Sequence, residues 1–431
     1  MSSYIIFGNY NKFYLYIWLY IIIRIILEYL LRNDILANKI KINYLKDEPF
    51  PKNILVQKTL YFIGITIFSM IIWKYQLRQD KRIKSHIISH NTQNTKLSSI
   101  NFIYNDSKKN IKEVSCVLFF SIIILFFLSD QLIRIINSFQ IKGLDYWMFE
   151  IIFICFINAN IFKETIYSHK KVAIYIILIF STSMKFISTL YILEDNDKKR
   201  LFKDYIWITP IIIIIFILLV FIRGYSYCRL KWLFDLKYIS EFKLLIIYGL
   251  IGSVLCLFCC IIATNIQCID KEDFNDITYF CKVSNNNNTY YDHFLIYFKD
   301  IWKEKREVWI NILYVIILLI KIFLSFLLEL FMVLIIKLLS PEYFICSFYI
   351  YYFIIQLIGL IQQFDFSLLF DFLAQFFAIF GGLIYLEIIE LNFCKLNYYL
   401  KKNITNRSLL ETRLSATDYN IMDNDNENED Y

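Results

Sequence analysis

Ten long apolar segments constrain the fold of this chain more than any other feature. Each is close to the ~20 residues that an α-helix needs to cross a bilayer at ~1.5 Å per residue. Apolar residues make up 58% of the sequence, more than a water-soluble core of this size would bury. We therefore predict an all-α fold, a polytopic transmembrane helix bundle within residues 1–392. The predicted spans are 13–31, 56–73, 114–136, 146–162, 172–192, 205–222, 244–264, 309–336, 343–361 and 368–388.

The first apolar segment leaves two placements open. It contains Arg24 and Glu28 and has no small-residue cleavage site after it, so we expect a retained span rather than a removed signal. The same charges also suit an amphipathic helix that lies at the membrane interface.

The distribution of Lys and Arg predicts the orientation of the bundle. The even-numbered loops and the two ends hold more of these residues than the odd-numbered loops, which places both termini in the cytoplasm. Residues 74–113 then form a basic cytoplasmic loop without apolar periodicity, which anionic lipid would attract. Residues 393–431 form a cytoplasmic tail whose acidic end we expect to be disordered. The membrane is either the plasma membrane or an endomembrane.

The loop at residues 265–308 faces the lumen or the exterior on this topology. It contains Cys268 and Cys281, and the triplet that begins at Asn287 is an acceptor for N-glycosylation. A disulfide and a glycan both require that side of the membrane. The alternatives are two unpaired thiols, and a triplet that arose by chance in a chain rich in Asn.

Several classes of function find no support in the sequence. The net charge of +7 comes from cations that separate apolar runs, whereas a nucleic-acid-binding domain gathers them on one face, so we expect no nucleic-acid partner. No HExxH, GxSxG, Walker A or paired DxD pattern occurs, and we predict no catalytic residue, metal site or cofactor.

Two acid–base pairs within predicted spans have helical i, i+4 spacing. Arg24 with Glu28, and Asp130 with Arg134, can each neutralise one another within one helix. We interpret both as structural ion pairs, since their members lie near the ends of spans and can reach the headgroups.

Other polar residues within the spans are candidates for a pathway, because an ionisable group at membrane depth is costly unless it is paired or hydrated. Lys321 lies near the middle of the eighth span, and Glu329 follows two turns later on nearly the same face. Asp371 and Gln375 share one stripe of the tenth span, which Gln356 of the ninth could join. These residues either line a binding cavity or form ion pairs between helices, and Glu150 and Lys185 are further isolated charges.

Two functional hypotheses follow. A transporter or channel of unknown substrate explains why a bundle of ten spans keeps polar groups at mid-membrane. The alternative is a membrane receptor or scaffold without transport activity, which would use the 265–308 loop for a ligand and the basic 74–113 loop and tail for cytosolic partners. Lipid handling and membrane enzymology remain as lesser alternatives.

The segment LEIIELNFCKLNYYLKKNI, from Leu386 to Ile404, resembles a closing signature of uncharacterised multi-span membrane proteins of fungi and protists. The stretch Trp232–Ser240 and the following residues 247–252 are similar to the same group. The resemblance implies a shared multi-pass architecture and a cytoplasmic tail. It implies no activity and assigns no catalytic or binding residue.

Overall fold

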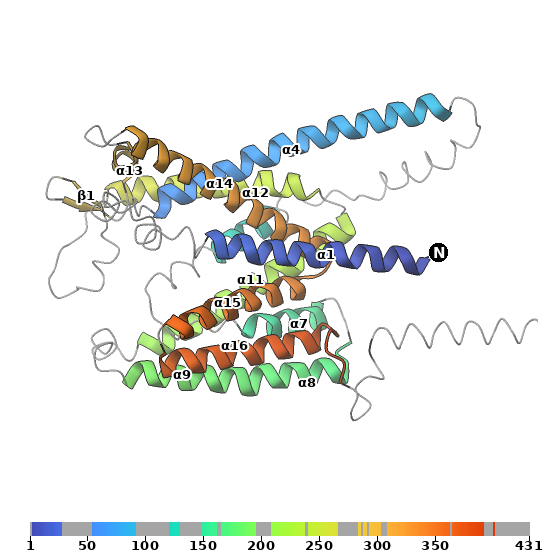
Figure 1. Cartoon of the computed structure of the whole chain (residues 1–431), viewed down its shortest axis with the longest axis vertical. Helices are drawn as coiled ribbons and strands as arrows, with labels where there is room; N and C mark the ends of the chain where they lie inside the picture. Colours follow the sequence, from blue (N-terminus) through green and yellow to red (C-terminus); the bar gives the residue numbers. More distant parts are fainter. Residues whose placement is uncertain are drawn as a thin grey trace, which may run out of the picture. The chain divides into compact units, whose positions relative to one another are not determined.

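The computed structural model describes most of the apolar part of the chain (Figure 1). The described residues are 2–27, 54–91, 120–129, 148–161, 165–194, 208–237, 240–265, 283–285, 288–290, 293–302, 308–362, 364–391 and 400. They form two compact units. The first comprises Met1–Ile141 and Asp197–Tyr351, and the second comprises Lys142–Asn196 and Tyr352–Tyr431. Each unit therefore joins two stretches that are distant in the sequence.

The described elements of the first unit are helices and one short hairpin. Its helices are α1 (Ser2–Ile25), α4 (Ile54–Asn91), an apolar helix at Phe120–Ser129, α11 (Ile208–Lys237), α12 (Glu241–Asn265), α13 (Phe294–Ile301), α14 (Val308–Leu338) and the first half of α15 (Pro341–Gln362). The antiparallel strands β1 (Val283–Asn285) and β2 (Asn288–Tyr290) pair Asn285 with Asn288.

The described secondary-structure elements of the second unit are all helices. It consists of α7 (Phe149–Ile161), α8 (Ser168–Ile176), the five-residue π-helix η2 (Ile177–Ser181), α9 (Thr182–Glu194), the second half of α15, and α16 (Phe366–Tyr385). The chain runs through α8, η2 and α9 as one continuous rod of helical turns, with the wider π-helical turn near its middle.

Seven described helices are long and apolar enough to cross a membrane, by length and composition. They are Leu55–Arg78, Ser168–Leu190, Ile213–Asp235, Glu241–Asn265, Asn311–Leu338, Pro341–Gln362 and Phe366–Tyr385. The three other predicted spans coincide with shorter apolar helices at Tyr14–Ile25, Phe120–Ser129 and Phe149–Asn160. The prediction of a helical membrane protein is thus confirmed, while the number of ten spans stays a prediction.

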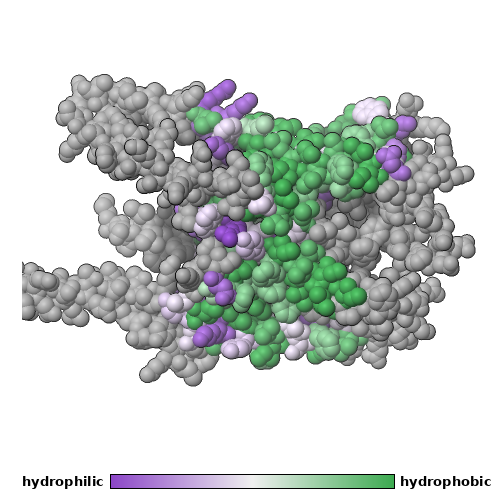
Figure 2. Space-filling view, turned by 180° about the vertical axis from the view of Figure 1, so that it is seen from behind, coloured by the Kyte–Doolittle hydropathy of each residue, from purple (hydrophilic) through white to green (hydrophobic). Residues whose placement is uncertain are grey.

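Hydrophobic side chains cover much of the described surface on the face that Figure 2 shows. Large apolar residues are exposed along several of the seven helices, among them Ile214, Val254 and Leu319. A water-soluble protein does not expose apolar surface on this scale, so a lipid bilayer is the environment that this surface fits.

Close contact between α4 and α12 organises the first unit. A Cβ atom on Gly249 would lie 2.4 Å from the Thr66 hydroxyl and 2.9 Å from the Phe62 carbonyl oxygen. A Cβ on Gly252 would lie within 2.4 Å of the Phe62 ring. Small residues at a helix interface let two backbones approach and gain dispersion energy, which drives association where lipid surrounds the helices. The two glycines therefore determine how near α12 lies to α4.

The helices packed around α4 run in alternating directions. Val56 and Cys260 share one buried cluster, while Lys243 lies over the Trp73 ring, so α12 is antiparallel to α4. Tyr314, early in α14, belongs to the cluster that holds Val56, so α14 is parallel to α4. These are the directions expected of the second, seventh and eighth of ten spans that cross a membrane alternately.

Two helices extend further than the sequence predicted. The structure differs from the predicted irregular loop at residues 74–113, because α4 continues to Asn91. Extending an existing helix costs little, and Lys, Arg and Gln are good helix formers.

The sixth span was predicted to end at Ile222, yet α11 continues to Lys237. The guanidinium of Arg223 lies over the rings of Tyr227 and Phe348 (5.8 and 5.5 Å to the centroids), so this buried charge does not end the apolar helix.

Candidate functional site

The α8–η2–α9 rod packs antiparallel against α16, and polar side chains lie in the interface between them. We name it the polar interface and define it by Ser181, Lys185, Ser188, Ser367, Asp371 and Gln375. Small residues bring the two rods together. A Cβ on Gly381 would lie 2.5 Å from the Ile177 side chain and 3.0 Å from the Ala173 carbonyl oxygen.

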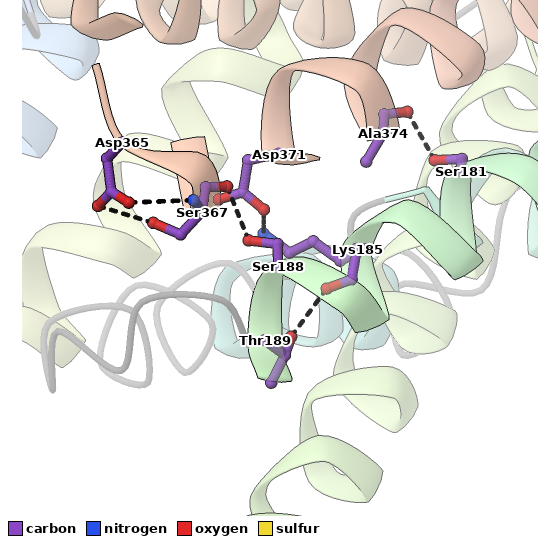
Figure 3. A network of polar contacts seen from close by, with 8 residues as sticks. All are labelled: Ser181, Lys185, Ser188, Thr189, Asp365, Ser367, Asp371 and Ala374. Atoms are coloured by element: carbon purple, nitrogen blue, oxygen red, sulfur yellow. Dashed lines mark hydrogen bonds and ion pairs between the residues drawn. The ribbon is translucent and has the colours of Figure 1, made fainter. Parts of the chain in front are cut away.

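An ion pair lies within this interface. The Lys185 Nζ is 2.9 Å from the Asp371 Oδ1, and the two side chains are 1% and 13% exposed (Figure 3). Taking either charge out of water alone would cost several kcal/mol, and the partner charge offsets much of that cost. The pair joins helices that are 186 residues apart in the sequence.

Hydrogen bonds also join the two helices between Ser188, three residues after Lys185, and the beginning of α16. The Ser188 hydroxyl donates to the Ser367 carbonyl oxygen (2.9 Å), and the Ser367 hydroxyl donates to the Asp365 carboxylate (2.9 Å). The same carboxylate accepts the Ser367 backbone N–H at 3.1 Å and caps the helix. Polar groups thus succeed one another from Asp365 to the buried pair (Figure 3).

Further along the interface, polar atoms are buried without full hydrogen bonding. The Ser181 hydroxyl donates to the Ala374 carbonyl oxygen at 2.7 Å. Gln375, one turn beyond Asp371, is 2% exposed, and its Oε1 has no hydrogen-bond partner among the described residues. The same holds for the Thr182 Oγ1, nearly one turn before Lys185. Buried polar atoms that lack partners are uncommon in folded proteins and call for an explanation.

The opposite end of the rod pair holds a second acid–base contact. The Nε2 of buried His169 lies 3.1 Å from the Glu387 Oε1, just beyond α16. Glu387 has a φ of 60°, a left-handed backbone conformation that is strained for a residue with a side chain. Non-glycine residues in this conformation occur disproportionately at functional sites.

The predicted pathway residues fall in both units. Asp371 and Gln375 do share one face of α16, as their spacing predicted, while half-buried Gln356 lies on the second-unit half of α15. Lys321 is 6% exposed on α14 in the first unit, where Glu329 is half-buried on the same helix. The sequence could not identify Lys185 as the partner of Asp371, because only the fold brings these two spans together.

Aromatic rings surround Arg24, which the sequence had assigned to an ion pair with Glu28. Its guanidinium donates to the Tyr20 hydroxyl at 2.6 Å and lies 4.2 and 4.8 Å from the ring centroids of Phe348 and Tyr351. Cation–π contacts of this kind stabilise a cation away from water. The remaining predicted residues lie outside the described part of the chain: Glu28, Asp130, Arg134, Cys268, Cys281 and Asn287.

Basic side chains gather where α4 leaves its predicted span and α11, α12 and α14 meet. Lys337 pairs with Glu241, and the Lys231 Nζ donates to the Lys337 carbonyl oxygen at 2.9 Å. The Lys243 Nζ lies 5.7 Å from the Trp73 ring centroid. Lys and Trp together are typical of the headgroup region of a membrane.

In the described residues, His, Cys, Asp and Glu form no group of three that could hold a metal ion.

No model of a known protein family matches the sequence, and no curated protein matches it. The proposed function is therefore argued from the contacts between residues in the structure. The resemblance of residues 386–404 to uncharacterised multi-span proteins stays a prediction.

Proposed function

We propose that this membrane protein is a transporter or channel, and that the polar interface between the α8–η2–α9 rod and α16 lines its pathway. The observation that carries the proposal is the Lys185–Asp371 pair, whose charges are 2.9 Å apart and almost wholly buried between two membrane-length helices. Ionisable groups within membrane spans are rare and commonly mark ion or proton pathways.

The surroundings of the pair favour transport over a purely structural role. A structural ion pair needs only its two charges, whereas here hydroxyl and carboxylate groups continue to Asp365 at the beginning of α16. On the other side lies the buried amide of Gln375, whose Oε1 has no partner within the described residues. A site that exchanges an ion needs such groups on both sides, while a site that only joins helices does not.

Reconstitution of the purified full-length chain into liposomes tests the proposal. Currents on a solid-supported membrane would be recorded as H⁺, Na⁺, K⁺ or Cl⁻ gradients are applied in turn. We expect a gradient-driven current or flux above that of protein-free liposomes for at least one of these ions. Liposomes that contain folded, inserted protein and move none of the four ions would contradict the proposal.

Lys321, in the first unit, is a predicted pathway residue that the same flux measurement tests separately. We expect Lys321→Met to lower the flux roughly fivefold or more and to leave the melting temperature close to that of the wild type, if this buried cation lines a pathway. Lys299→Met is the matched control, because Lys299 is exposed on α13. Wild-type flux in the Lys321 variant would exclude Lys321 and leave the proposal for the polar interface unchanged.

The proposed topology has both termini in the cytoplasm and residues 265–308 on the other side. A glycosidase should then increase the gel mobility of the wild type but not of an Asn287→Gln variant. Cys268 and Cys281 should react with maleimide only after reduction. Thiols that react without reduction, and only from the cytosolic side, would require the orientation to be reversed.

We also propose that anionic lipid binds the basic ends of α11, α12 and α14. Lys231, Lys243 and Lys337 lie at those ends, and Trp73 contacts Lys243. On the proposed topology, these ends face the cytoplasmic leaflet. The negative surface potential of that leaflet contributes ~1 kcal/mol of binding free energy for each basic residue near it.

A further inference from the structure

We infer that the ion carried by the polar interface is the proton, and that the Lys185–Asp371 pair is the group that takes it up and releases it. This inference rests on the proposed function and specifies its ion. Packing, hydrogen bonding and charge in the second unit each bear on it.

The two helical rods pack closely along the part of the interface from Ala374 to Gly381. At Gly381 even a methyl group would overlap Ile177, at 2.5 Å. Ala374 and Ala378, on the same helix, are fully buried. A metal cation would need either its water shell or several oxygen ligands in place of that shell. A proton needs neither, since it passes between hydrogen-bonded groups that barely move.

The pair can transfer a proton and return to its starting state with every charge accounted for. A proton from the Asp365 side first adds to the Asp371 carboxylate, giving a neutral acid beside the Lys185 ammonium. The ammonium no longer faces the Asp371 carboxylate and releases one proton on the other side, which leaves a neutral amine. The Asp371 acid, 2.9 Å away, then gives its proton to the Lys185 amine. One proton has entered, one has left, and the ion pair is restored.

Polar groups are present on both sides of the pair for these steps. Towards the beginning of α16, the Ser188 hydroxyl donates to the Ser367 carbonyl oxygen, and the Ser367 hydroxyl donates to the Asp365 carboxylate. Beyond the pair, the Gln375 Oε1 and the Thr182 Oγ1 are buried and accept no hydrogen bond from any described residue. Either oxygen could accept one while the Lys185 ammonium releases its proton.

Other ionisable groups in the second unit determine the charge around the pair. Apart from tyrosines and Cys155, those with described side chains are Lys170, Lys171 and His169 on α8, Glu150 on α7, and Asp365, Glu387 and Glu390 at the ends of α16. His169 precedes Lys185 by about 24 Å of helix at ~1.5 Å per residue, so the His169–Glu387 contact belongs to the far end of the interface. Glu150 is fully buried, so the Glu150→Gln variant must be measured alongside the variant of the Lys185–Asp371 pair.

Proton flux through reconstituted full-length protein tests the inference. Liposomes would contain a trapped pH dye, and a potassium gradient with valinomycin would supply the voltage. We expect the wild type to acidify the lumen and the Lys185→Met/Asp371→Leu double variant to lose at least nine-tenths of that rate. Asp235→Asn is the matched control, because Asp235 belongs to the more exposed Lys231 pair in the first unit. Glu150→Gln shows whether a second buried carboxylate of the unit takes part.

Each result supports or overturns the inference. The double variant removes both charges together, so a pair that only joins the helices predicts a stable protein with normal flux, and that outcome would overturn the inference. Na⁺, K⁺ or Cl⁻ flux without proton flux in the wild type would also overturn it and leave the proposed function intact. Liposomes that move none of these ions would overturn both. Size-exclusion chromatography and the melting temperature show whether each variant is folded.

Discussion

Asp371→Asn is expected to lower the free energy of unfolding by about 3–5 kcal/mol, because it leaves the Lys185 ammonium buried beside a neutral amide. The Lys185 side chain is 1% exposed, so its charge cannot recover hydration without moving the helix. The measurement is titration of the purified protein with SDS in mixed micelles, followed by its helical circular dichroism.

The matched variants separate the ion pair from the shape of the site. Lys185→Met/Asp371→Leu should recover most of the lost stability, since replacing both partners of a buried ion pair with apolar residues is often neutral or stabilising. Asp235→Asn removes a carboxylate whose side chain is 54% exposed, and should cost less than about 1 kcal/mol. A double variant as unstable as the single one would contradict this explanation, because the lost stability would then not come from an uncompensated Lys185 charge.

Gly249→Val is expected to separate α4 from α12 and to destabilise the first unit by about 3 kcal/mol or more. The added Cβ would lie 2.9 Å from the Phe62 carbonyl oxygen and 3.0 Å from the Thr66 backbone nitrogen, and neither backbone atom can turn away as a side chain would. Overpacking usually costs about 1–3 kcal/mol where side chains can adjust, so a backbone contact should exceed that range. The same SDS titration measures it.

Gly359→Ala is the control for the glycine substitution. No atom lies within 4 Å of a Cβ added at Gly359, which is also helical, in α15. Its replacement should be neutral or stabilise the helix by up to about 1 kcal/mol, as expected from helix propensity. Equal losses in the Gly249 and Gly359 variants would contradict the close packing of α4 and α12.

The sequence predicts what depends on residues near one another along the chain. The apolar runs predict the helices, and the i, i+4 spacing of Asp371 and Gln375 correctly predicts that they share a face. The partner of Asp371 depends on which spans meet, and no local pattern encodes that. Arg223 shows the same limit, since a lysine or arginine at the end of an apolar run indicates a boundary until the rings that surround it are known.

The sequence therefore identifies charged side chains within the spans but does not identify their partners. The sequence left open whether the buried charges form a cavity or ion pairs between helices, and the Lys185–Asp371 contact is such an ion pair. It also left Lys321 and Asp371 as members of one candidate set, whereas they belong to separate units. The π-helix at Ile177–Ser181 has no simple sequence signature, although its last residue, Ser181, belongs to the polar interface.

The distance along the chain between Lys185 and Asp371 has a consequence for synthesis in the cell. Ribosomes add ~5–20 residues per second, so the 186 residues that separate the pair take roughly 10–40 s to make. Throughout that interval, the lysine has been made and the aspartate that will neutralise it has not. We therefore expect the nascent α9 to keep its ammonium in water or at the headgroups during this interval. Its insertion into the bilayer would then be completed only when α16 arrives.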